Sequence, residues 1–301
     1  MNLSSKIRVA VLRGGPSYSY DTSLKTGEHV LSTLRDIPEK YEPLDIFISR
    51  DGEWHHGGLA QEPHRALQYA DVAWNALHGS YGEDGQVAKL LEGMRIPFTG
   101  SRAVPSAMAM NKDMSKRFYR GHLLLAPEAE LVTEDSLDED HLINIFRNYL
   151  PPIVVKPAHT NGSVGLSLAH SFSELKEAIK KAFSHSPRVL VEEFIRGHEA
   201  FCTVIEKAKG ERLYALLPHS ELKLRTEENK RIEEMAKLAH EALGLRHYSS
   251  SDFIVTPKKK IYILETSVSP AFHDDSLMHR SLRATGWQSR DFVDHVLTLA
   301  L

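Results

Sequence analysis

The sequence contains one cysteine, Cys202, and no long uninterrupted run of apolar residues. A single cysteine cannot form a disulfide within the chain, so nothing indicates an oxidising compartment. Cys202 lies in the strand-like run AFCTVI without a recognisable nucleophile signature, which favours a core residue. The N-terminus lacks the apolar segment of roughly 7 to 15 residues of a signal peptide, and no stretch approaches the ~20 apolar residues of a membrane span. We therefore expect a cytoplasmic protein.

An excess of one charge sign is also missing. The 301 residues include 37 Lys and Arg against 40 Asp and Glu, a formal net charge of -3. This balance argues against broad electrostatic capture of nucleic acid or of an anionic membrane, so neither is expected as a partner. With 42% hydrophobic and 26% charged residues, the composition is that of a soluble globular protein of two or three domains.

Strand-like and helix-like segments alternate along the chain, which predicts an α/β fold. In the first unit we expect strands over 7–12, 45–49, 71–77 and 96–98 and helices over 23–34 and 87–94. The second unit begins with a long helix over 103–120 and contains the strands IVVKP and SVGLSL and a helix over 172–183. The third is rich in strands, with a helix over 227–242 and two C-terminal helices. We therefore predict three domains, 1–100, 101–187 and 188–301.

Two acidic residues are predicted to face each other near the C-terminus. If SDFIVT and IYILE pair around a turn between Lys258 and Lys259, Asp252 lies opposite Glu265, on a face shared with Ile263. Like charges opposed in this way are destabilising, and a bridging cation would relieve the repulsion. Two hard oxygen ligands suit Mg²⁺, and the lack of nearby His or Cys argues against zinc. The alternative is a solvated acidic pair in a slightly different register.

Glycine-containing segments offer two further candidate sites. Lys156 leaves an apolar strand just before the loop NGSVG, where a lysine and backbone N–H groups could contact phosphate, although a plain hairpin is the alternative. HGSYGEDG connects a predicted strand to a predicted helix, a common position for ligands in α/β sheets. Within it His78 is the better ligand candidate, because Glu83 or Asp84 could cap the helix. Lys112, on the predicted helix over 103–120, reads alone as a solvated lysine.

Several segments in one order resemble the D-alanine-D-alanine ligase family of the ATP-grasp superfamily. They are VLRGGPSYSYDTSLKTG, NALHGSYGEDGQVAKLLEGMRIPFTGS, AMNKDMSK, VVKPAHTNGSVGLS, VLVEEFIRGHE, SDF and LETSVSP. The resemblance runs from about residue 7 to the C-terminus, with a gap near residue 218. It implies a three-domain ATP-grasp fold, with ATP between the central and C-terminal domains, and a homodimer formed through the N-terminal domain.

The resemblance also implies roles for individual residues. Lys112 and Lys156 would contact the nucleotide phosphates, and Ser163, Val164 and Gly165 would belong to the loop that closes over them. The adenine would be read by the hinge residues Glu192, Glu193, Phe194 and Ile195, and the ribose by Glu199. Mg²⁺, or Mn²⁺, would be held by Asp252 and Glu265, the pair that the hairpin also selects, with Ser267 as a third ligand. Active-site positions fall on His78, Ser163 and Ser19, and on Ser276 with Leu277 for the second D-alanine.

Departures from the family concentrate on the substrate side. Ser19 stands where the family has a glutamate for the ammonium group, although Asp21 is two residues away. Ser250 stands in place of the arginine that stabilises the oxyanion, and Ser267 in place of a magnesium-binding asparagine. Gly162 replaces a loop serine. The segment 216–222 runs almost directly into the next helix, without the family's covering loop.

Three functions fit this pattern. The first is a D-alanine-D-alanine ligase of peptidoglycan precursor synthesis, acting through an acyl phosphate. The second is a carboxylate-amine ligase for another pair of substrates, and the third is a nucleotide-binding homologue without ligase activity. The retained lysines and metal ligands favour an enzyme.

Overall fold

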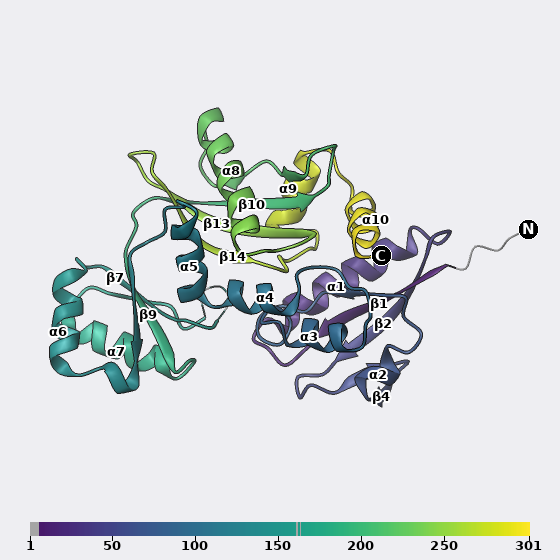
Figure 1. The fold of residues 1–301 in the computed structure, drawn as a ribbon, viewed down its shortest axis with the longest axis horizontal. Coiled ribbons are helices and arrows are strands. Elements are labelled where there is room, and N and C mark those ends of the chain that lie inside the picture. The colour runs from purple at the N-terminus through teal and green to yellow at the C-terminus, as the bar shows by residue number, and fades with distance from the viewer. Residues whose placement is uncertain (1–5, 161, 163) are drawn as a thin grey trace, which may run out of the picture.

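The computed structural model describes residues 6–160, 162 and 164–301 and contains three β-sheets. Figure 1 shows the middle sheet of the chain set apart from the other two, with α4 (Ala103–Met110) and α5 (Lys112–Gly121) in the region between. None of the helices in these ranges is long and apolar enough to cross a membrane.

The first sheet has the strand order β4-β3-β2-β1-β5. Its strands are β1 (Ile7–Gly14), β2 (Tyr41–Ile48), β3 (Trp54–His56), β4 (Leu59–Gln61) and β5 (Val72–Asn75). β1 is central and pairs in parallel with β2 and β5. β1 ends at Gly14, where the chain adopts a φ of +92°. Glycine is required at this position because a Cβ would lie 2.2 Å from the Ile48 carbonyl oxygen. The helices of this region are α1 (Tyr20–Arg35), α2 (Pro63–Ala66) and α3 (Gln86–Gly93).

The central sheet is antiparallel, in the order β6-β9-β7-β8. It comprises β6 (Ala129–Thr133), β7 (Ile153–Pro157), β8 (Ser167–Ala169) and β9 (Arg188–Glu193), with helices α6 (Glu139–Asn148) and α7 (Phe172–Phe183) and the 3-10 turn Glu134–Ser136. The domain boundaries stay a prediction. Because β9 pairs with both β6 and β7, sheet membership favours a second boundary after Glu193 rather than after residue 187.

The C-terminal sheet follows the order β11-β10-β13-β14, with β12 also paired to β10. Its strands are β10 (His198–Glu206), β11 (Leu213–Ala215), β12 (His219–Ser220), β13 (Tyr248–Val255) and β14 (Ile261–Ser267), accompanied by α8 (Thr226–Ala242), α9 (Leu277–Ala284) and α10 (Ser289–Ala300). One apolar cluster joins β1, β5 and α1 to α9 and α10, while the cluster under the central sheet uses only residues of that unit. Cys202 is fully buried, as expected.

Two predicted elements differ in the structure. The helix expected over 103–120 is two helices, broken at Asn111, whose ψ of 101° ends α4. The Asn111 side-chain oxygen then accepts hydrogen bonds from the backbone of Asp113 and Met114, so an asparagine caps α5. The strand expected over 96–98 is reduced to an isolated bridge between Phe98 and Ala73.

Candidate active site

The two carboxylates of the predicted hairpin lie opposite each other. Asp252 on β13 pairs with Glu265 on β14, and Ser250 pairs with Ser267. Beyond Asp252 the register shifts by one, so that Phe253 faces Ile263 and Leu264 is the extra residue of a β-bulge.

The bulge makes one sequence prediction wrong, that Ile263 shares the face of the carboxylates. Phe253, Val255, Ile261 and Ile263 are all buried in the apolar cluster that includes α8. An extra residue in β14 reverses the alternation of side chains at that point. Glu265 therefore leaves the α8 face and lies with Asp252 on the opposite face of the sheet.

Burial and mutual repulsion act on the carboxylate pair. Burial, with repulsion from Glu265 and Glu199, raises the pKa of Asp252 to about 7, and Lys112 lowers it in part. Burial also acts to raise the pKa of Glu265, but Lys112 and Lys156 outweigh it and the net direction is downward. A pair of partly buried oxygen ligands, one of which resists ionisation, fits a hard divalent cation, whose charge would offset the repulsion.

Lys112 is the first residue of α5 and is buried, which excludes the solvated alternative. Its Nζ lies 2.5 Å from Glu265 Oε2, and its backbone N–H donates to the Ala158 carbonyl. The Asn111 cap fixes where α5 begins. Lys112 therefore joins the start of this helix to the carboxylate pair and to the end of β7.

A second buried charge group surrounds Glu192 at the end of β9. Lys156 Nζ lies 2.9 Å from Glu192 Oε2, and Lys116 Nζ lies 3.2 Å from Glu192 Oε1. All three side chains are almost fully buried. Burial lowers the pKa of Lys116 to about 8, against the opposing effect of Glu192. Sequence reasoning missed Lys116, although its place one helical turn after Lys112 in MNKDMSK was an available signal.

The loop after β5 reaches the same region through Glu83. Its Oε2 accepts a hydrogen bond of 2.6 Å from the Gly79 N–H, and its Oε1 accepts one of 2.6 Å from the Ser267 hydroxyl. Asp84, in contrast, accepts from the backbone of Tyr81 and Gln86 at the start of α3. The capping alternative thus applies to Asp84, while Glu83 links the first sheet to β14. A small cavity is lined by Glu83, Met110, Lys112, Thr160, Glu265 and Ser267, among others.

Two family models match parts of this chain. The family model described as "D-ala D-ala ligase C-terminus" matches residues 126–219 and 217–298, and the one described as "D-ala D-ala ligase N-terminus" matches residues 56–101. A curated D-alanine-D-alanine ligase of Geotalea uraniireducens is 34% identical, over 97% of this chain and 95% of that protein. The chain belongs to the D-alanine-D-alanine ligase family.

Solved structures with that family name have the same fold. A D-alanine-D-alanine ligase from Coxiella burnetii superimposes with a TM-score of 0.88 at 23% identity, covering 98% of this chain and 95% of the other. A D-alanine-D-alanine ligase from Bacillus anthracis, described as complexed with ATP, gives a TM-score of 0.82 at 25% identity, covering 98% and 96%. The fold predicted from the sequence, an α/β fold of the ATP-grasp ligases, is therefore confirmed.

The residues that the sequence predicts to read adenine, Glu192 to Ile195, lie at the end of β9 and in the connection to β10. Glu193 accepts a hydrogen bond from the Glu128 backbone, Phe194 is partly exposed, and Ile195 is buried. Glu199 is exposed and lies opposite Ile254 of β13, next to Asp252. Val164 is half-buried, and its carbonyl accepts from Thr160. Ser163 lies outside the described residues, so its expected role has no structural account here.

His78 and Ser19 lie on neighbouring loops of the first sheet. His78 is buried, and its Nε2 lies 2.8 Å from Thr26 Oγ1. Burial lowers the pKa of His78 to about 4, so the ring is neutral at pH 7. The hydroxyl of Ser17 donates to the His78 carbonyl, and the Ser19 N–H donates to Ser17. The sequence-predicted Ser19 therefore lies beside the HGSYGEDG loop.

The residues that depart from the family on the substrate side have defined partners in the structure. Asp21, the candidate to replace the family glutamate, is exposed and forms an ion pair with Arg50. Ser250, which stands in place of the family's arginine, is buried, and its hydroxyl lies 2.6 Å from that of Thr203. β12 pairs with β10, and only residues 221–225 separate it from α8. The short connection expected near residue 218 is thus confirmed.

Ser276 caps α9, whose first residue is Leu277. The Ser276 hydroxyl accepts from the His279 N–H and donates to the His273 carbonyl. Leu277 is 39% exposed and is therefore not a core residue, while the Ser276 side chain is the N-cap of the helix. An exposed leucine beside a capped helix start is accessible to a ligand.

Proposed function

We propose that the protein is an ATP-dependent carboxylate-amine ligase that joins two molecules of D-alanine for peptidoglycan precursor synthesis, in the cytoplasm. The observation that carries this proposal is the cluster of buried Lys112 with the partly buried pair Asp252 and Glu265, beside the ion pair of Lys156 with Glu192. Family membership supports the choice of substrates, because the curated relative is named for D-alanine.

The reaction has two steps. The carboxylate of the first D-alanine attacks the γ-phosphorus of ATP, giving an acyl phosphate and ADP. The amine of the second D-alanine attacks the acyl carbon, and phosphate leaves with the bonding electron pair while the amine loses a proton. Lys112 and Lys156 would offset negative charge on the phosphoryl oxygens, and the loop containing Val164 and Gly165 would exclude water from the acyl phosphate.

Asp252 and Glu265, with Ser267 beside them, are the residues that would hold Mg²⁺. The bound ion would supply electrostatic stabilisation of the transferring phosphoryl group. Glu192 to Ile195 would contact adenine and Glu199 the ribose, while Ser276 and Leu277 would contact the second substrate. Neutral His78 would act as a hydrogen-bonding group near the first substrate rather than as a charge.

A second candidate, a ligase for a different acid and amine, is favoured by one specific observation. Ser19 replaces the ammonium-binding glutamate, and Asp21 is engaged at the surface by Arg50. A substrate acid without an amino group would not need that anchor.

The deciding experiment measures ADP release from Mg-ATP with and without D-alanine, together with dipeptide formation. We expect D-alanine-dependent release that is abolished by Lys156→Ala and by Asp252→Asn and retained by Lys181→Ala, since Lys181 is exposed on α7. ADP release that depends only on another acid and amine would establish the second candidate. ATP binding without turnover for any pair would mean a homologue without ligase activity.

A further inference from the structure

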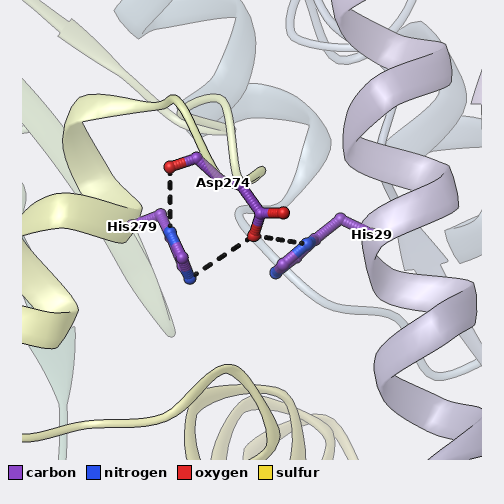
Figure 2. A group of neighbouring side chains, drawn as sticks. All are labelled: His29, Asp274 and His279. Carbon is purple, nitrogen blue, oxygen red and sulfur yellow. Dashed lines mark hydrogen bonds and ion pairs between the residues drawn. The ribbon is translucent and has the colours of Figure 1, made fainter.

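Away from the ATP-side residues, two histidines and one aspartate converge between α1 and the start of α9 (Figure 2). His29 projects from α1, Asp274 from the loop before α9, and His279 from α9 itself. His29 Nδ1 lies 3.4 Å from Asp274 Oδ1, and His279 Nε2 lies 3.8 Å from the same oxygen. One ligand atom from each of the three residues lies within 4.8 Å of the others.

These separations are long for hydrogen bonds and suit ligands around a small cation. An N–H···O bond spans about 2.7 to 3.2 Å, so the carboxylate makes no short bond to either ring. Around Zn²⁺ with bonds of 2.0 to 2.2 Å, tetrahedral geometry places neighbouring ligand atoms about 3.4 Å apart. Asp274, whose side chain is 82% exposed, can rotate to complete the approach.

The remaining ring nitrogens are already held. His279 Nδ1 lies 3.1 Å from the Asp274 backbone carbonyl oxygen, which can only accept, so Nδ1 carries the proton. In the neutral ring the lone pair is then on Nε2, facing the carboxylate. His29 Nε2 lies 2.9 Å from the Ser289 hydroxyl. Histidines that bind metals almost always have the second nitrogen anchored in this manner.

We propose that His29, Asp274 and His279 form a binding site for a divalent transition metal ion, with Zn²⁺ as the preferred occupant. Two imidazole nitrogens and one carboxylate oxygen favour a borderline ion such as Zn²⁺ over Mg²⁺, which prefers oxygen ligands. Three protein ligands would leave the fourth tetrahedral position to a water molecule.

An entry route adjoins the cluster. A surface cavity of about 460 Å³ is lined by His279 and Arg283 of α9, by Ser289, and by residues of the turn between α9 and α10. The side-chain exposures of 15% for His29 and 9% for His279 shield the two nitrogens from bulk water, while Asp274 faces it. An ion can therefore reach the site without unfolding the protein.

A metal ion at this site would stabilise the loop of Ser276 and Leu277, which belongs to the proposed active site, without using Asp252 or Glu265 as ligands. Asp274 lies two residues before Ser276, and His279 lies three residues after it. On α1, Thr26 lies one turn before His29 and contacts both His78 and the Phe272 backbone. A bound ion would thus fix the loop of Ser276 and Leu277 against α1.

The test is Zn²⁺ binding by the full chain, measured by isothermal titration calorimetry in excess Mg²⁺ so that Asp252 and Glu265 do not take up Zn²⁺. We expect one Zn²⁺ per chain, and a visible absorption band of low-symmetry Co²⁺ when cobalt replaces it. Asp274→Asn, at an exposed position that tolerates the change, should weaken binding by at least about ten-fold, and His29→Gln or His279→Gln by more. The control His122→Gln removes an exposed histidine and should bind as the wild type does.

Thermal unfolding gives a second readout. Zn²⁺ at about a hundred times its Kd should raise the Tm of the wild type by roughly 5 °C and that of Asp274→Asn by much less. Equal Zn²⁺ affinity in wild type and Asp274→Asn, or no binding by the wild type at micromolar Zn²⁺, would overturn the proposal. Neither result depends on ligase activity, so this proposal and the proposed function fail separately.

Discussion

Asp252 occupies an environment that favours its neutral form. Partial burial and the negative charges of Glu265 and Glu199 raise its pKa to about 7. An acid whose pKa rises on folding binds its proton more tightly in the native state. The ionised form therefore destabilises the fold progressively as pH rises from the unfolded pKa near 4 to the folded value, and the full penalty applies above pH 7.

Asp252→Asn should therefore stabilise the metal-free protein while removing activity. In EDTA at pH 8, we expect the free energy of unfolding to rise on the order of 3 kcal/mol, with a gain less than half as large at pH 5. Urea denaturation of both proteins at the two pH values measures this difference, and Asp51→Asn at the surface serves as the control. A stabilisation that does not change with pH would contradict the electrostatic explanation.

The local sequence predicted that Asp252 and Glu265 lie opposite each other, but it did not predict the β-bulge that decides which face of the sheet their neighbours occupy. Simple alternation placed Asp252 opposite Glu265, yet nothing in IYILE signals that Leu264 is the extra residue of a bulge. The bulge is fixed by packing, because only that shift lets Ile263 join Phe253 in the apolar cluster. Lys116 and Glu83 were missed for a related reason, since their partners Glu192 and Ser267 lie far away in the sequence.

The break between α4 and α5 has a testable consequence for Lys112. Asn111→Ala removes the side chain that caps α5 and should lower the free energy of unfolding by about 1 kcal/mol. Because Lys112 is the first residue of that helix, we also expect weaker binding of ATP. Asn111→Ser restores a capping oxygen and should recover most of both losses, as followed by urea denaturation and nucleotide titration. If Asn111→Ser behaves like Asn111→Ala, the cap does not position Lys112.

The N-terminal and C-terminal units of the molecule share an apolar core, whereas the central unit has a core of its own. The cluster around β1 draws residues from Val9 to Leu297, whereas the cluster of the central sheet draws only on residues from Val132 to Val191. Figure 1 shows that sheet, with α6 and α7, set apart from the other two. A unit with its own core can open without disturbing the rest.

Hydrogen exchange in increasing guanidinium should therefore reveal two unfolding units. Peptides from β7, β9 and α7 are expected to lose protection together, at lower denaturant concentration than peptides from β1, β10 and β13. Peptides from α10 should follow β1, because both belong to the same cluster. Simultaneous loss of protection in β1 and β7 would show that the chain unfolds as one unit.

The packing of α10 against the first sheet also bears on how the chain folds during translation. Phe292, Val293, Val296 and Leu297 complete the cluster that contains Val9 and Val11, and Asp294 bonds to Lys40 and Tyr41. About 280 residues separate Val9 and Val11 from Phe292, so at 5 to 20 residues per second a ribosome needs roughly 14 to 56 s to supply α10 after β1. During that interval α1 covers only part of this apolar cluster, and the surface that α10 will bury stays exposed on the nascent chain.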